Sequence, residues 1–188
     1  MKLRYILELD LKRAIAKMGP LLQIMPKAKI KHSKRVAKEL NKAKAGKIGV
    51  YAGLLHDYLE RGGDLYTLSQ HIDELKLPPQ IIQAVHALSA DEENVKTQPN
   101  QPLSHIQAVL QGIDDDGLRN IVILAKLSDR LDNLKKRGKR GKIGVKYRAK
   151  SLDLINWLSH NYTGKSKPLH IMLKAIDKLL PAVQTELT

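Results

Sequence analysis

Two histidines and two aspartates are the residues of this 188-residue chain whose types and spacing could do chemistry. His32 is followed 24 residues later by the pair His56-Asp57, and Asp129 lies in the run Leu-Ser-Asp-Arg-Leu-Asp-Asn at 127–133. Two imidazoles and two carboxylates suit one divalent cation and leave coordination positions for water and substrate. We therefore predict a metal centre formed by His32, His56, Asp57 and Asp129, and donors of these types fit manganese, iron or zinc.

A structural role is the alternative for these four residues. A histidine on the apolar face of a helix is often a hydrogen-bonded core residue. That explanation must hold separately for both histidines and both carboxylates, and burying a carboxylate is costly unless it is paired or binds a cation. A single metal ion accounts for all four residues together.

Three expected helices would point these side chains toward the interior. His32 lies four residues before Val36 and eight before Leu40, so it shares their apolar face. The same kind of spacing places His56 and Asp129 on the apolar faces of two later helices.

The rest of the chain also has the apolar spacing of helices, and no segment is a convincing strand. Polar residues 91–102 include two prolines and predict a loop. Asp114, Asp115 and Asp116 are expected to cap the helix that opens near Gly117. We expect an all-α fold, a bundle of about eight or nine helices, in one domain spanning 1–188. The expected helices cover about residues 3–18, 28–44, 48–61, 64 or 67 to 76, 78 onward, 103–112, 117–135, 143–160 and 167–180.

The motifs around the four residues carry a resemblance to a known family. They include the run Gly-Leu-Leu-His-Asp-Tyr-Leu-Glu at 53–60 and the run Lys-Leu-Ser-Asp-Arg-Leu-Asp-Asn-Leu at 126–134. With His32, they resemble the hydrolase domain of RelA/SpoT-type alarmone enzymes, in the HD superfamily of metal-dependent phosphohydrolases. The resemblance covers about residues 25–160. It implies an all-helical HD fold, a manganese ion, and removal of pyrophosphate from the 3′ position of guanosine tetra- or pentaphosphate.

Two further residues would be catalytic in such an enzyme. Glu60 lies one turn after His56 and could orient or deprotonate the attacking water. Asn133 lies one turn after Asp129 and would contact the substrate, a phosphorylated nucleotide.

The chain departs from the family pattern at several positions. Family members have Asp directly after the motif glutamate, whereas this chain has Arg61, and the Pro that usually follows the first metal histidine is Ser33. Family members usually carry a basic pair and a Gly/Pro-Tyr-Ile segment shortly before that histidine, where this chain reads Gln-Ile-Met-Pro-Lys-Ala-Lys-Ile-Lys at 23–31. The class of reaction is therefore predicted more firmly than the substrate.

The net charge of +14 indicates an anionic partner or a strongly solvated surface. Residues 135–150 hold nine basic side chains and no acid, and they could clamp substrate phosphates or form a solvated turn. The candidate substrate-binding residues are Lys27, Lys29, Arg61, Arg130, Lys136, Lys146 and Arg148.

Two other functions stay open. One is an HD hydrolase of another nucleotide or phosphodiester, and the other is a basic nucleic-acid-binding module with a relic HD site.

The absence of cysteine excludes disulfides and thiol nucleophiles. The longest apolar run, Ile121 to Ala125, is too short to span a membrane. We see no signal peptide and expect a soluble cytoplasmic protein without a membrane partner; the sequence makes no prediction of oligomeric state.

Overall fold

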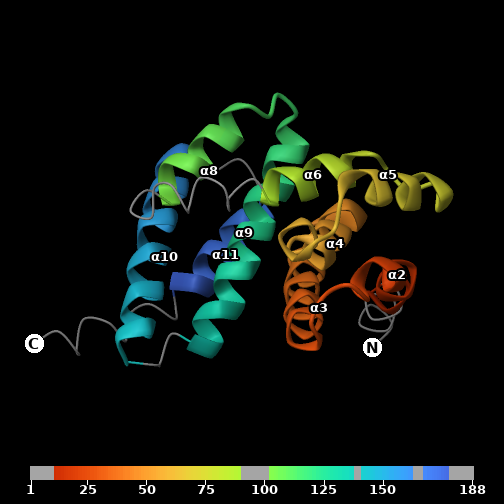
Figure 1. Cartoon of the computed structure of the whole chain (residues 1–188). Coiled ribbons are helices and arrows are strands. Elements are labelled where there is room, and N and C mark those ends of the chain that lie inside the picture. The colour runs from red at the N-terminus through yellow and green to blue at the C-terminus, as the bar shows by residue number, and fades with distance from the viewer. Residues whose placement is uncertain (1–10, 90–101, 138–140, 163–166, 178–188) are drawn as a thin grey trace, which may run out of the picture.

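The computed structural model describes residues 11–89, 102–137, 141–162 and 167–177. Every regular element in these ranges is a helix, so the predicted all-α fold is confirmed. Helical residues 11–17 come first. The elements that follow (Figure 1) are α2 (Gly19–Leu22), α3 (Lys27–Lys42), α4 (Gly46–Leu55), the 3-10 helix η1 (Leu59–Arg61), α5 (Leu65–Glu74), α6 (Gln80–Ser89), α8 (Pro102–Gln111), α9 (Asp116–Arg137), α10 (Gly141–Tyr162) and α11 (Lys167–Asp177).

The long helix α9 is the central element of the bundle. It packs against α10 and α11 on one side and against α3, α4 and α6 on the other, as Figure 1 shows. None of the described helices is long and apolar enough to cross a membrane. The two sets of helices therefore meet along α9, and the candidate site lies on its α3 side.

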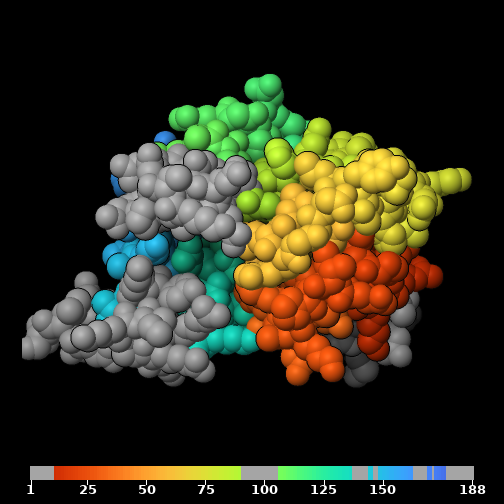
Figure 2. All heavy atoms as spheres, viewed as in Figure 1, coloured from red at the N-terminus to blue at the C-terminus, as the bar shows by residue number. Residues whose placement is uncertain are grey.

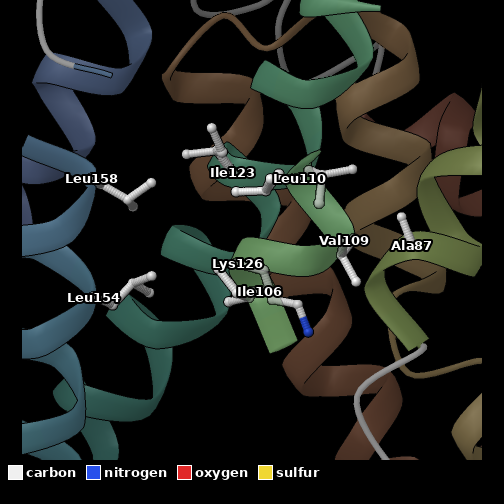
Figure 3. A pocket seen from close by; sticks show the side chains of 9 residues that line it. Ala87, Ile106, Val109, Leu110, Ile123, Lys126, Leu154 and Leu158 are labelled. Carbon is white, nitrogen blue, oxygen red and sulfur yellow. The ribbon is translucent and has the colours of Figure 1, made fainter. Parts of the chain in front are cut away.

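Two apolar clusters form the core. The larger joins α9 to α8, α10 and α11 and includes Leu124, Leu158 and Ile176. Figure 3 shows part of it, where Leu154 and Leu158 of α10 face Ile123 of α9. The second cluster joins α2 to α6 and consists mainly of aliphatic side chains, together with Tyr51 and Tyr58. Both clusters contain residues of α3 and α4, which therefore connect the two halves.

A glycine allows α3 and α4 to approach closely. A Cβ atom on Gly53 would lie 2.4 Å from Cδ1 of Leu40 and 3.3 Å from the backbone of Ala37. Only a residue without a side chain fits there unless the helices move apart. This close approach matters for function because α3 and the end of α4 carry the two predicted metal-binding histidines.

Local sequence signals begin two helices as predicted. Asp64 caps α5, since its carboxylate accepts a hydrogen bond of 2.8 Å from the amide of Thr67. Asp115 caps α9 by accepting hydrogen bonds from the amides of Gly117 and Leu118. The expected capping role of the acids at 114–116 is confirmed. The predicted loop at 91–102 lies outside the described residues except for Pro102.

The third expected helix is shorter than its apolar pattern predicts. Helix α4 ends at Leu55, and the chain tightens into a turn before η1. The amide of Tyr58 donates to the carbonyl of Leu55, three residues earlier. His56 therefore terminates α4, and Asp57 lies in the turn rather than on a continuous helix.

Candidate metal centre

The structure brings the four predicted ligands together from three elements. Nε2 of His56 lies 3.2 Å from Nε2 of His32 and 3.5 Å from Oδ1 of Asp57. Oδ1 of Asp129 lies 2.9 Å from Nε2 of His32 and 3.9 Å from Nε2 of His56. Both histidines and Asp57 are buried, and these three residues form a group that can hold a metal ion. Asp129 on α9, the fourth predicted ligand, is half-buried and lies beside the two histidines of this group.

Hydrogen bonds orient both imidazoles toward the same point. Nδ1 of His32 lies 2.7 Å from Oδ2 of Asp132, and Nδ1 of His56 lies 2.9 Å from the carbonyl oxygen of Gly53. A carboxylate and a carbonyl can only accept, so each Nδ1 carries the proton. In the neutral form of each ring, Nε2 carries a lone pair that points toward the other donors. Hydrogen bonds of this kind are typical of metal-binding histidines.

Burial and the neighbouring charges shift the pKa values of His32, His56 and Asp129 in different directions. Burial opposes protonation of His32, but hydrogen bonds with Asp129 and Asp132 outweigh it and raise its pKa to about 9. Burial lowers the pKa of His56 and thus favours the neutral ring. Burial also opposes ionisation of Asp129, yet the hydrogen bond from His32 and the charge of His56 hold its pKa well below the usual range. The two aspartates therefore keep a proton, and its positive charge, on His32, and a bound metal cation would take the place of that proton.

The donor set fits a divalent transition metal. Ligand bonds of about 2.1 Å place neighbouring donors roughly 3 to 3.5 Å apart, and most of the distances above fall in or near that range. Two imidazoles with two carboxylates suit manganese, iron or zinc. His32, His56, Asp57 and Asp129 would hold such an ion.

A cavity of about 430 Å³ opens over these donors. Glu60 and Asn133, the two predicted catalytic residues, both line it. Nδ2 of Asn133 donates a hydrogen bond of 2.7 Å to Oδ1 of Asp129, so the amide is held beside the candidate ligand. The volume lies within the range of small-molecule sites. The other described lining residues are Ala28, Lys29, His32, Arg35, His56, Asp57, Leu88, Ala125, Lys126, Asp129, Asp132 and Lys136.

Four cations line the same cavity. Lys29 pairs with Asp57 at 2.8 Å, and Arg35 pairs with Asp132 through two hydrogen bonds of 2.6 and 3.0 Å. Lys136 lies 3.9 Å from Asp132, and Lys126 donates to the carbonyl of Leu88. Figure 3 shows that Lys126 projects from α9 among apolar side chains such as Ile106. The cavity thus combines a candidate metal centre with lysine and arginine side chains that suit phosphate groups.

The structure places the predicted substrate-binding residues in different surroundings. Lys29 and Lys136 line the cavity. Lys27 at the start of α3 and Arg61 in η1 are exposed, and neither is among the described lining residues. Arg130 is half-buried beside Asp129, whose pKa its charge helps to lower, whereas Arg148 is buried on α10. The side chain of Lys146 lies outside the described part of the chain.

Sequence reasoning did not identify Asp132, Arg35 or Lys126 as site residues. Asp132 follows Asp129 by three positions, and Arg35 follows His32 by three. Residues at this spacing lie on one side of a helix, so the signal was present in the sequence. Lys126 precedes Asp129 by three positions and carries the same signal.

Comparisons with protein-family models, with curated proteins and with solved structures found no match to this chain.

Proposed function

We propose that this protein is a divalent-metal-dependent phosphohydrolase that acts on a nucleotide. The observation that supports the proposal most directly is the convergence of two oriented imidazoles and two carboxylates at the base of a cation-lined cavity. A site that only binds a metal ion has no need of Glu60, Asn133 and four basic residues around it. Hydrolysis of a phosphate ester uses all of these groups.

The division of roles among the residues follows from their chemistry. A divalent metal bound there supplies a Lewis acid that polarises a phosphoryl oxygen and lowers the pKa of water. Glu60 accepts the proton of the attacking water and orients it. Asn133 contacts the substrate while its amide keeps Asp129 in place.

The cations hold the phosphates. Lys29, Arg35 and Lys136 neutralise negative charge as it builds up on phosphorus and the leaving group. Arg35 is suited to bidentate contact because its guanidinium presents parallel N–H groups. Each of these three side chains pairs with Asp57 or Asp132, and a bound phosphate would compete for these contacts.

Within this class we propose a guanosine 3′,5′-bis(diphosphate) 3′-pyrophosphohydrolase-like activity that depends on manganese. The motifs at 53–60 and 126–134 support this choice of substrate through their resemblance to RelA/SpoT-type hydrolase domains. Arg61 replaces the family's second acidic residue, and we expect slower turnover than in enzymes with the full Glu-Asp pair. The turnover screen therefore includes other nucleotides beside the alarmones.

The proposal is tested by metal analysis followed by a turnover screen. Purified protein is expected to contain or take up about one manganese ion per chain, measured by elemental analysis. It is then incubated with alarmones, nucleoside triphosphates, dinucleotide cofactors and cyclic dinucleotides, with Asp129→Ala as the inactive control. Release of pyrophosphate from an alarmone supports the full proposal.

Two other outcomes would change the assignment. Cleavage of a different nucleotide, with alarmones untouched, refutes the substrate and keeps the hydrolase. Failure to bind any divalent metal refutes the hydrolase itself and leaves a basic binding module with a relic site.

A further inference from the structure

The exposed side of α3 carries a regular row of lysines. Lys27, Lys31, Lys34 and Lys38, here called the α3 lysine row, are all exposed. Their spacing of four, three and four residues keeps them on one side of the helix, because a helix has 3.6 residues per turn. At a rise of 1.5 Å per residue the row extends for about 17 Å. The orange atoms of this region reach the surface along the lower part of the face in Figure 2.

Acidic partners are scarce along this row. Among the described residues, no ion pair involves any of its four lysines. The one acid of α3, Glu39, pairs instead with Lys42 and Lys135, each at 3.1 Å. The row therefore presents a line of positive charge to solvent.

The charge pattern works against the stability of α3. Lys27 and Lys31, like Lys34 and Lys38, are like-charged pairs four residues apart, which destabilise a helix. The first turn holds no acid, although the helix dipole favours negative charge there. A sequence that breaks several local rules at one place commonly does so for function.

We propose that the α3 lysine row binds a nucleic-acid duplex through its phosphates. A duplex carries about one negative charge per 1.7 Å of its axis, so about ten phosphates span the length of the row. Each lysine thus has a phosphate within reach, and no base needs to be read. The inference goes beyond the proposed hydrolase, since it requires neither the metal nor the cavity.

A duplex fits this surface better than a single strand. Proteins that bind single strands without sequence preference stack the bases on exposed aromatic side chains. Of the aromatic residues whose side chains the structure describes, only Tyr66 is exposed, and it lies on α5. The row offers charge without a stacking platform.

The test measures the salt dependence of binding with metal-free protein. Labelled duplex RNA and duplex DNA of about 20 base pairs are titrated at salt concentrations from about 50 to 200 mM. The triple variant Lys31→Gln, Lys34→Gln and Lys38→Gln is expected to weaken binding about tenfold or more at ~0.1 M salt. The slope of log K against log salt should become shallower by about 3.

A matched control removes the same charge elsewhere. Lys12, Lys47 and Lys174 are exposed on other parts of the chain, and changing all three to glutamine should leave the slope nearly unchanged. The triple variant Lys31→Arg, Lys34→Arg and Lys38→Arg should retain binding. Glutamine and arginine keep the helix propensity of lysine, and circular dichroism checks that α3 persists.

Several results would overturn the proposal. One is an equal loss of duplex binding in the row variant and in the control variant. Another is the absence of duplex binding at the lowest salt concentration. The third is a row variant that loses binding to anionic phospholipid vesicles but binds duplexes as well as the original protein. Tighter binding of either duplex RNA or duplex DNA supports the proposal and shows which of the two nucleic acids is the partner.

Discussion

Oδ2 of Asp132 lies 2.7 Å from Nδ1 of His32, across 100 positions of the sequence. The same carboxylate accepts two hydrogen bonds from Arg35. Asp132 therefore holds the ring of His32 from α9, while Nε2 of that ring faces Asp129, which lies on the same helix. One helix thus supplies both a candidate ligand and the group that orients another.

Removing the charge of Asp132 tests this orientation. Asp132→Asn is expected to weaken manganese binding by about 10–100-fold, the usual effect of losing a hydrogen-bond partner of a metal-binding histidine. Titration of metal-free protein with manganese measures the affinity. Asp73→Asn is the control, because Asp73 is exposed on α5 and away from the cavity lining. Unchanged affinity in Asp132→Asn would show that the ring needs no such support.

Metal binding should stabilise the folded protein. At a manganese concentration about 100 times the Kd, stability rises by ~2.7 kcal/mol, which raises the Tm by about 5–10 °C in a protein of this size. A chelator should reverse the shift. Asp129→Ala should lose the shift and nearly all turnover while its helical circular dichroism remains. A full manganese-dependent shift in that variant contradicts the ligand assignment.

Glu60→Gln separates catalysis from metal binding. The amide has the shape of the carboxylate but cannot accept the proton of water, so turnover should fall ~10²-fold or more. Metal content should stay the same, because Glu60 is not among the four proposed ligands. If turnover persists at the original rate, another group activates water.

Gly53→Ala tests the close packing of α3 and α4. The new methyl group would overlap Leu40, so we expect a loss of about 1–3 kcal/mol in the free energy of unfolding. Manganese affinity should fall as well, because His56 is hydrogen-bonded to the carbonyl of Gly53. Chemical denaturation and metal titration give the two values.

The control for this change is Gly19→Ala. A Cβ atom at Gly19 would meet no atom within 4 Å, so that variant should be unchanged or slightly more stable. Equal destabilisation of both variants would mean that the contact between α3 and α4 is not the cause.

Local signals in the sequence were sufficient for most of the fold. Apolar spacing predicted α3 and α9 to within about two residues at each end, and the acids before Gly117 predicted the cap that Asp115 forms. These features depend on neighbours along the chain, which periodicity and capping rules describe directly.

Features that depend on tertiary contacts were harder to predict. Apolar spacing continued past Leu55, but α4 ends there and His56 hydrogen-bonds back to Gly53. The spacing from Asp129 places Asp132 on the same side of α9, but it does not indicate that Asp132 hydrogen-bonds His32, because that pairing joins two helices far apart in the sequence. Nor does the basic run at 135–150 indicate that Arg148 is buried on α10.

The separation of the candidate ligands along the chain has a consequence for protein synthesis. His32, His56 and Asp57 are made early, whereas Asp129 follows Asp57 by 72 positions. At about 5–20 residues per second, translation takes ~4–14 s to cover that interval. During this time the nascent chain has three donors and lacks the fourth. A complete centre, and the stability that a metal gives it, can therefore arise only after α9 has emerged from the ribosome.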